Sequence, residues 1–300
     1  QQQILYCRCF HNNFKVKAYF AMTYQAWFKT FRETLGDLMA KSEVDSIFFL
    51  TIEHFTGMGR TDFYLSEQQV AEPDVSNSLN HVLQKLKLQE PIQYILNEAW
   101  FMEHKYYVNP HVLIPRSETE ELVQYILKNR PGAGKVLDIG TGSGCIAIEL
   151  EQALSANVWA IDYSEDVLKV ARKNAKSRNS RVQFVQDDIL SPTTRFGFGF
   201  DVIVSNPPYI LESEKAEMKQ NVLNFEPGDA LFVHDNNPLV FYEAIRNFST
   251  HNIEQNGLLM VEINEYLSKA TKALFEKSFE KVEIIKDIHN KDRFITATNE

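Results

Sequence analysis

A glycine-rich turn constrains the fold of this chain more than any other stretch. An apolar run at 136–139, which includes Asp138, leads into Gly140-Thr141-Gly142-Ser143-Gly144, and a helical pattern follows at 145–154. Glycine permits positive φ and lets the backbone approach a ligand closely. Dinucleotide-binding enzymes use G-x-G-x-x-G, which places a pyrophosphate at a bare helix N-terminus. Here an acid precedes G-x-G-x-G, and an acid at a strand end suits the ammonium group of an amino-acid moiety.

Strand and helix patterns alternate through the rest of the chain. We expect strands at 135–139, 157–161, 182–186, 201–205, 257–263, 281–287 and 293–298, with helices between most of them. This alternation predicts a seven-stranded, Rossmann-like α/β sheet that is mostly parallel and covered on both faces. Only a few residues, 289–292, join the last two strands. They are too few for a parallel crossover, so the last strand should be antiparallel.

The N-terminal part of the chain has a different organisation. Residues 1–21 lack periodicity, and we interpret them as a tag or non-native extension. Residues 22–90 carry apolar and aromatic stripes at helical spacing, which are typical of the core of a small helical bundle. This domain could hold a partner. Its first helix should be capped by Thr23, and its second should begin at Ser42 with Asp45.

Residues 91–112 are expected to link the two domains as a β-hairpin. The strand patterns lie at 93–96, 100–101 and 106–108. The catalytic domain then occupies 113–300, and Ser117 with Glu120 predicts a capping box at the start of its first helix.

Composition excludes several classes of protein. The chain has 300 residues, 44% of them hydrophobic, and a net charge of -9. This charge disfavours a partner held by nonspecific phosphate contacts, although a local basic patch stays possible. No apolar run reaches the roughly 18 residues that a membrane span requires. The three cysteines form no disulfide framework, and Cys7, Cys9 and His11 are too isolated to indicate a metal site, so we expect a cytoplasmic protein without a metal.

Further acids follow the next two predicted strands. Asp162 ends the second strand, where a carboxylate can accept hydrogen bonds from the two hydroxyls of a ribose. An N-cap on the next helix is the alternative role, which Ser164 could fill instead. Asp188 and Ile189 end the third strand, where the acid can accept from an adenine amine and Ile189 can cover the ring. Together with the glycine turn, these residues indicate S-adenosylmethionine rather than NAD.

The fourth strand ends at Ser205-Asn206-Pro207-Pro208-Tyr209. Proline cannot extend a strand ladder, so Asn206 is held at the carboxyl end of the strand, where open α/β sheets bind ligands. The Asn206 side-chain oxygen and the Pro207 carbonyl can accept both hydrogens of a planar NH2 group, while Tyr209 packs on it. This arrangement would point the nitrogen at a methyl donor. A strand-terminating turn without chemistry is the other interpretation of the stretch.

These motifs resemble those of class I S-adenosylmethionine-dependent methyltransferases that modify amino groups. Three flanking segments narrow the resemblance: 90–96 (EPIQYIL), 113–120 (LIPRSETE) and 225–231 (FEPGDAL). Together they are similar to the peptide chain release factor glutamine methyltransferases (PrmC/HemK), and the similarity covers about residues 23–298. The family implies a helical N-terminal domain, a hairpin linker and a Rossmann-like catalytic domain.

The resemblance also implies a reaction and its residues. The family methylates the side-chain nitrogen of the glutamine in the GGQ motif of class I release factors, and S-adenosyl-L-methionine becomes S-adenosyl-L-homocysteine. Asp138, the turn 140–144, Asp162, Asp188 and Ile189 would bind the donor, together with Asn206. The catalytic residues would be Asn206, Pro207 and Tyr209, and Arg116 and Pro208 would join them in binding the substrate. The chain departs from the family at Ser117, Ile189, Asn97 and Phe279, where we expect Pro, an aromatic residue, Gly and Gly.

Two other functions stay open from the sequence. A nucleic-acid methyltransferase acting on an adenine or cytosine exocyclic amine would need the same kind of motif, because a flipped base offers the same planar NH2. The acidic balance and the absence of an obvious basic recognition domain disfavour it. A non-catalytic scaffold that binds the cofactor is the third possibility. We expect a monomer that binds release factors, with no membrane contact and no stable nucleic-acid binding.

Overall fold

The structure is a computed structural model that describes residues 22–299. It divides into two compact units between Leu88 and Gln89. The expected extension, with Cys7, Cys9 and His11, lies outside the described residues. Within the described part of the chain, no helix combines the length and apolarity of a membrane span, and no cluster of three or more His, Cys, Asp or Glu side chains could hold a metal ion.

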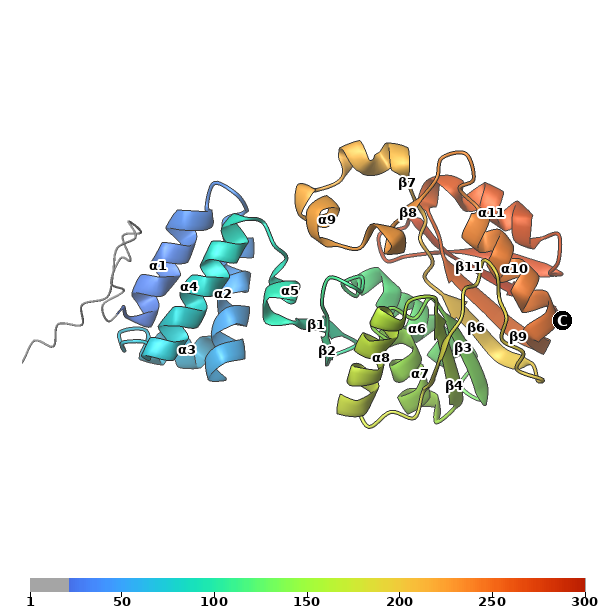
Figure 1. Cartoon of the computed structure of the whole chain (residues 1–300), viewed down its shortest axis with the longest axis horizontal. Helices are drawn as coiled ribbons and strands as arrows, with labels where there is room; N and C mark the ends of the chain where they lie inside the picture. The colour runs from blue at the N-terminus through green and yellow to red at the C-terminus, as the bar shows by residue number, and fades with distance from the viewer. Residues whose placement is uncertain (1–21, 300) are drawn as a thin grey trace, which may run out of the picture. The chain divides into compact units, whose positions relative to one another are not determined.

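The first unit is a bundle of helices, drawn in blue to cyan in Figure 1. Its core is aromatic: Trp27, Phe31, Phe48 and Phe63 are completely buried. The Phe48 and Phe63 rings meet edge to face with centroids 5.5 Å apart, an arrangement that the quadrupoles of the rings favour. The aromatic stripes therefore form a packed core. The helices are α1 (Tyr24–Leu35), α2 (Lys41–Thr56), α3 (Arg60–Ser66) and α4 (Pro73–Lys87).

The helix starts in this unit agree with prediction at one place and differ at another. Thr23 caps α1 as predicted, because its hydroxyl oxygen accepts from the N–H of Ala26 at 3.1 Å. The helix α2 is present and begins at Lys41, one residue before the predicted Ser42, but it has no side-chain cap, so the predicted start with Ser42 and Asp45 is wrong. Asp45 instead accepts two hydrogen bonds from Arg32, at 2.6 and 2.7 Å. Such a two-pronged ion pair uses the carboxylate oxygens that capping would need.

The second unit opens with a short helix where we expected a strand. Residues 93–96 lie in α5 (Ile92–Leu96), so the strand prediction is wrong there. The Pro91 carbonyl accepts from the N–H groups of two residues of α5, which closes a helical turn. Asn97 ends the helix in the left-handed conformation, with φ 54°. Asn tolerates this region better than most residues, so it serves in the place where we expected glycine.

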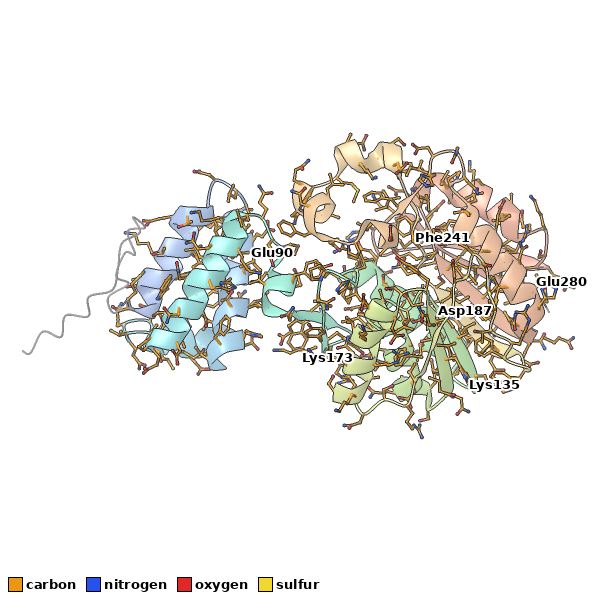
Figure 2. All side chains as sticks on the ribbon, in the orientation of Figure 1. Glu90, Lys135, Lys173, Asp187, Phe241 and Glu280 are labelled. Atoms are coloured by element: carbon orange, nitrogen blue, oxygen red, sulfur yellow. The ribbon has the colours of Figure 1, made fainter. Side chains whose placement is uncertain are left out.

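A hairpin follows the short helix, as predicted. β1 (Glu98–Phe101) pairs antiparallel with β2 (His104–Tyr107). Tyr107 at its end is tied to the rest of the unit, because its backbone N–H donates to Asn174 at 2.7 Å and Lys173 lies over its ring (Figure 2). The hairpin therefore packs on the α/β part of this unit.

The main sheet has the seven strands and the topology that the sequence predicts. Its order is β10-β11-β9-β6-β3-β4-β5, and β11 runs antiparallel to both of its neighbours. From β3 the chain continues to β4 and β5 on one side of the sheet and then crosses to β6 on the other side. Open α/β sheets bind ligands at such a reversal of strand order. The strands are β3 (Lys135–Ile139), β4 (Asn157–Asp162), β5 (Gln183–Gln186), β6 (Phe200–Ser205), β9 (Ile253–Glu262), β10 (Lys281–Lys286) and β11 (Asp292–Thr298).

Helices cover both faces of this sheet (Figure 1). Val136 packs into the core beneath α6 (Ser117–Asn129), α7 (Cys145–Leu154) and α8 (Glu165–Ser177). Leu137, the next residue, packs into the opposite core with α10 (Val240–Asn252) and α11 (Ser268–Phe275). Successive strand residues point to opposite faces, so a strand buried on both sides is apolar at most of its positions.

The predicted capping box at the start of α6 is wrong. Ser117 is already the first helical residue, and Arg116 at the N-cap makes no side-chain hydrogen bond to the helix backbone. Glu120 instead accepts from the backbone N–H of Met102 at 3.0 Å, which ties α6 to the hairpin. The N–H in the hairpin turn would be unpaired without this carboxylate, whereas water can reach the N–H groups at the helix end.

Short elements connect β6 to α10 above the carboxyl edge of the sheet. Two strands of this connection pair parallel to each other. The connection comprises β7 (Ile210–Leu211), η1 (Glu212–Glu217), α9 (Gln220–Phe225), η2 (Gly228–Ala230) and β8 (Phe232–Val233), and η3 (Glu265–Leu267) follows β9.

Candidate active site

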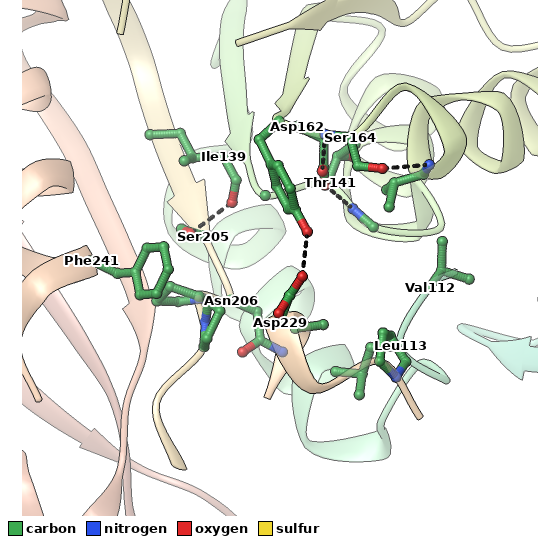
Figure 3. A pocket seen from close by; sticks show the side chains of 18 of the residues that line it. Val112, Leu113, Ile139, Thr141, Asp162, Ser164, Ser205, Asn206, Asp229 and Phe241 are labelled. Carbon is green, nitrogen blue, oxygen red and sulfur yellow. Dashed lines mark hydrogen bonds between the residues drawn. The ribbon is translucent and has the colours of Figure 1, made fainter. Parts of the chain in front are cut away.

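The glycine turn forms one wall of a cavity of about 880 Å³ at the carboxyl edge of the parallel strands (Figure 3). Gly140 and Gly142 have φ values of 72° and 56°. A Cβ atom added to either would meet no other atom within 4 Å, and both residues line the cavity. The space that a side chain would take is therefore open to a ligand. This observation fits a donor molecule held against bare backbone.

The other residues of the turn have different positions. Thr141 and Ser143 also line the cavity, whereas Gly144 does not. A Cβ at Gly144 would lie 3.2 Å from the Cβ of Ala171, so this glycine allows close packing of α7 against α8. The N–H groups of Gly140 and Thr141 donate to the Ile161 carbonyl at 2.9 and 3.1 Å, which holds the turn beside the end of β4.

Asp138 lies beneath the turn and does not line the cavity. It is completely buried, and one carboxylate oxygen accepts from the Thr141 hydroxyl at 2.6 Å. The other oxygen makes no hydrogen bond to the described residues. Burial, together with the nearby charge of Asp162, raises the pKa of Asp138 to about 7. Because Asp138 does not line the cavity, its contact with a cofactor stays a prediction.

Asp162, at the end of β4, lines the cavity. Its two carboxylate oxygens accept from the N–H groups of Gly142 and Ser164, each at 3.2 Å. Burial raises its pKa, although these N–H bonds act in the opposite direction. Ser164 caps α8 through the N–H of Val167, so Asp162 is not the helix cap. Its remaining lone pairs can accept from two neighbouring hydroxyl groups.

The two adjacent acids after β5 have distinct surroundings. Asp187 is buried and accepts hydrogen bonds from the backbone N–H groups of Thr193 and Thr194, so it anchors the following loop. Asp188 is exposed and makes a local bond to the N–H of Leu190 at 2.9 Å. Asp188 and Ile189 both line the cavity, at the place where the sequence predicts an adenine ring.

Asn206 (Figure 3), Pro207 and Pro208 line the cavity beyond the end of β6. The Asn206 side-chain NH2 donates to the Thr119 hydroxyl at 3.1 Å, and this hydroxyl donates to Glu262 at 2.8 Å. Ser205, the residue before Asn206, is fixed in place because its hydroxyl donates to the Ile139 carbonyl at 2.7 Å. The structure thus brings the Asn-Pro-Pro turn and the glycine turn to one cavity, as the sequence predicts.

Comparisons with known proteins cover both units. A model of the PrmC N-terminal domain matches residues 27–96, and a model of the methyltransferase small domain matches 117–225. The release factor glutamine methyltransferase of Flavobacterium psychrophilum is 43% identical over 88% of this chain and 95% of its own length. That of Bacteroides thetaiotaomicron is 41% identical over 89% of this chain and 96% of its own length.

The chain belongs to the release factor glutamine methyltransferase family. The class I methyltransferase fold is also that of solved structures. A 16S rRNA methyltransferase of T. Thermophilus, in complex with AdoMet and guanosine, has a TM-score of 0.51 over 68% of this chain and 50% of that chain, at 18% identity. At this identity the likeness concerns the fold alone.

Two residues expected to contact substrate have other partners in this methyltransferase. The guanidinium of Arg116 lines the cavity but forms an ion pair with Glu226 at 2.7 Å. Tyr209 does not line the cavity; its hydroxyl donates to Glu262 at 3.0 Å. Burial, followed by the charge of Glu262, raises the pKa of this phenol well above its usual value, so it stays protonated. Contact of either residue with substrate stays a prediction.

Sequence reasoning missed several residues of this site. Tyr163 and Asp229 line the cavity and share a hydrogen bond of 3.0 Å (Figure 3). Thr119 lines it too, and Glu262 lies directly behind Thr119 and Tyr209. Thr119 and Asp229 fall in the family segments 113–120 and 225–231, which was a usable signal. No pattern marks Glu262, because it is one acid at the end of an apolar strand.

Proposed function

We propose that this enzyme transfers a methyl group from S-adenosyl-L-methionine to the side-chain amide nitrogen of the glutamine in the GGQ motif of class I peptide chain release factors. The protein is a methyltransferase by family, and S-adenosyl-L-methionine is its methyl donor. The observation that supports the proposed acceptor is Asn206, whose amide lines the same cavity as the glycine turn. An amide side chain can pair with a carboxamide, because the oxygen of either group accepts a hydrogen bond from the NH2 of the other.

The donor would be held by the residues at the ends of three strands. The backbone of Gly140 and Gly142 would lie against its amino-acid part, and Asp138 would support the turn from beneath through the Thr141 hydroxyl. Asp162 would accept from the ribose hydroxyls, and Asp188 with Ile189 would flank the adenine. When bound, the donor supplies an electrophilic methyl carbon. Its positive sulfur and ammonium suit a cavity edge that carries these acids.

Asn206 and Pro207 would prepare the acceptor. A carboxamide nitrogen is a weak nucleophile because its lone pair is delocalised into the carbonyl. If the Asn206 Oδ1 and the Pro207 carbonyl accept its two N–H bonds, the nitrogen is fixed in one orientation. As the lone pair forms the new N–C bond, positive charge develops on the nitrogen and both hydrogen bonds strengthen. One N–H proton is then lost to water, and the sulfur keeps the electron pair of the broken S–C bond.

The helical unit supplies the natural place for a protein partner. We propose that residues 22–90 dock the release factor, that the hairpin at 91–112 links them to the catalytic part, and that the enzyme works as a monomer in the cytoplasm. Tyr64 and Leu65 support docking, since these large hydrophobic residues have exposed fractions of 58% and 81%. Such residues often lie at protein contacts. The net charge of -9 supports a protein substrate over a nucleic acid.

A methyl-transfer assay tests the proposed function. The enzyme is incubated with labelled donor and with purified release factor, DNA or ribosomal RNA in separate reactions, and the release factor is analysed by mass spectrometry. We expect one methyl group on the glutamine of the GGQ motif and none on a release factor with Glu in its place. Label on nucleic acid alone would overturn the proposal.

Two variants separate the acceptor site from the donor site. Asn206→Ala should lower kcat by about 10²–10³-fold, the usual effect of removing one preorganised transition-state hydrogen bond, while donor affinity stays nearly unchanged. Asp162→Ala should weaken donor binding by about tenfold to a hundredfold, as expected for a lost hydrogen bond to a charged group. Calorimetry gives the donor affinity and steady-state kinetics give kcat. Equal loss of donor affinity in both variants would contradict these separate roles.

A further inference from the structure

We propose that Thr119 and Glu262 are positioning residues that turn the Asn206 amide so that its oxygen, not its nitrogen, faces the methyl acceptor. This inference rests on the proposed function, because it assigns a purpose to the orientation of the residue that receives the substrate. The three side chains come from separate elements: α6, the end of β9 and the turn after β6. Neither Thr119 nor Glu262 belongs to the Asn-Pro-Pro-Tyr motif.

The hydrogen bonds form a chain with a fixed direction. Glu262 is 1% exposed, and its two carboxylate oxygens accept from the Tyr209 hydroxyl at 3.0 Å and from the Thr119 hydroxyl at 2.8 Å. A hydroxyl has one hydrogen, so Thr119 can only accept from its remaining neighbour. That neighbour is the Asn206 amide at 3.1 Å. Only the NH2 end of the amide can donate, so this end must face Thr119.

The consequence for the cavity follows from the shape of the amide group. With Nδ2 engaged by Thr119, Oδ1 is the end available to a ligand, and Asn206 lines the cavity. A carbonyl oxygen accepts hydrogen bonds from an NH2 group and offers nothing to another carbonyl. The chain from Glu262 therefore selects an acceptor that presents hydrogens, which is what a carboxamide nitrogen does. A flipped amide would present hydrogens to hydrogens and exclude the nitrogen from the reactive position.

The direction of the chain depends on the ionised form of Glu262. Burial opposes this form and raises the pKa of Glu262, as does Glu118 on α6, whereas the hydroxyls of Thr119 and Tyr209 and the charge of Arg293 on β11 act in the opposite direction. Tyr242 on α10 donates to the Glu262 backbone oxygen at 3.2 Å. A protonated Glu262 would donate to Thr119, whose hydrogen would then turn toward Asn206. Turnover should therefore fall as the pH drops through this raised pKa.

Paired substitutions at Thr119 separate hydrogen bonding from packing. Thr119→Val keeps the volume and removes the hydroxyl, whereas Thr119→Ser removes a methyl group and keeps the hydroxyl. We expect Val to lower kcat for the release factor by about tenfold to a hundredfold, with donor affinity unchanged, and Ser to recover most of that loss. If packing were the only role of Thr119, the order of the two variants would be reversed. That reversal, or an unchanged kcat in Thr119→Val, would overturn the proposal.

Glu262→Gln is an independent test should the Thr119 variants fold poorly. The Gln NH2 can donate to Thr119, which frees the Thr119 hydrogen for Asn206 and removes the fixed direction. We expect a similar loss of kcat, and the acidic limb of the pH profile should disappear in this variant. Donor affinity serves as the check on folding. A Gln variant with wild-type kcat and an unchanged acidic limb would overturn the proposal.

These outcomes are distinct from failure of the proposed function. If the wild-type enzyme leaves release factors unmodified, the acceptor assignment is wrong whatever the variants do. If it modifies the GGQ glutamine while Thr119→Val keeps its full kcat, the positioning role alone is wrong. In the Asn206→Ala background, Thr119→Val should cost no further activity, because the group it orients is already absent. An additive loss would contradict a shared role.

Discussion

Single carboxylates at the carboxyl edge of the sheet do different work although they look alike in the sequence. Asp138 is completely buried with one free oxygen, Asp162 lines the cavity with both oxygens already bonded to backbone N–H groups, and Asp187 anchors a loop. Only the surroundings of each acid decide whether it meets a ligand. The pKa values follow the same surroundings, since burial raises the pKa of Asp138 and of Asp162.

Asp138 should make the protein less stable as the pH rises. An unfolded Asp has a pKa of about 4, whereas the folded pKa is about 7. Between these values the unfolded state has released a proton that the folded state still holds, so the free energy of unfolding falls with rising pH and levels off above about pH 7. Asp138→Asn removes this effect. The difference in urea-unfolding free energy, variant minus wild type, should therefore become more positive by on the order of 2 kcal/mol between about pH 5 and pH 8.

Asp187→Asn is the matched control for that measurement. Burial opposes ionisation of Asp187, but the N–H bonds from Thr193 and Thr194 outweigh it and hold its pKa below the ordinary value. Its stabilising effect is therefore complete above about pH 4. The loss in Asp187→Asn should be the same at both pH values. A difference between wild type and Asp138→Asn that does not change with pH would contradict the assignment of the raised pKa.

The sequence predicted the location of single residues best where the end of a strand determines it. Asp162, Asp188 and Asn206 follow consecutive parallel strands, and parallel strands bring their carboxyl ends to one edge. The contact from Thr119 to Glu262 was not predictable in this way. These residues are 143 positions apart, and their meeting depends on where β9 lies in the sheet and on how α6 packs against it. The order of the strands, not any local pattern, creates this contact.

At the scale of elements, boundaries depend on competition for hydrogen bonds. The strands of the main sheet were predictable because burial on both faces requires continuous apolar runs. The segment 93–96 was not, because its residues suit a strand while Pro91 and Asn97 close a helical turn around them. In the loop 191–199, which contains two glycines, the Phe198 ring lies 4.9 Å from the ring of Trp159, so aromatic packing holds this stretch.

The glycine turn gives a prediction that separates backbone strain from ligand contact. Gly140 and Gly57 both have φ 72°, and a Cβ at either would meet no atom within 4 Å. Ala at either position should cost about 1 kcal/mol or somewhat more of stability, because L-residues are disfavoured at this φ. Only Gly140→Ala should weaken donor binding, since Gly140 lines the cavity and Gly57 ends α2.

Melting temperatures and donor affinity check this pair of variants. Gly57→Ala shows the effect of strain alone, so any additional loss of affinity in Gly140→Ala measures the contact between the turn and the donor. Equal donor affinities in the two variants would show that the turn does not contact the donor.

At the scale of the whole molecule, the division into two units suggests a division of work. The catalytic unit holds the cavity, and the helical unit holds exposed apolar side chains over a core of its own. If the helical unit docks the release factor, recognition of the protein and recognition of the glutamine are separate steps. Binding energy from a distant surface can then raise the efficiency of a reaction on one side chain.

Leu65→Ser tests this division. Leu65 is 81% exposed, so its replacement should leave the fold intact. We expect the KM for the release factor to rise by about threefold to tenfold, in line with the loss of one apolar contact in an interface. Turnover of a short peptide that contains only the GGQ loop should be unchanged. An unchanged KM for the whole release factor would place the docking surface elsewhere.

The link between Arg116 and Glu226 has a mechanical consequence for the cavity. Glu226 is nearly buried and receives both the Arg116 guanidinium at 2.7 Å and the backbone N–H of Ile114 at 3.4 Å. Separation of the segment 114–116 from Glu226 would leave the Glu226 carboxylate buried without its cationic partner, at a cost of about 3–5 kcal/mol. Entry of a bulky polypeptide loop must therefore move the segment 114–116 and Glu226 together, because the ion pair and the backbone hydrogen bond keep them joined.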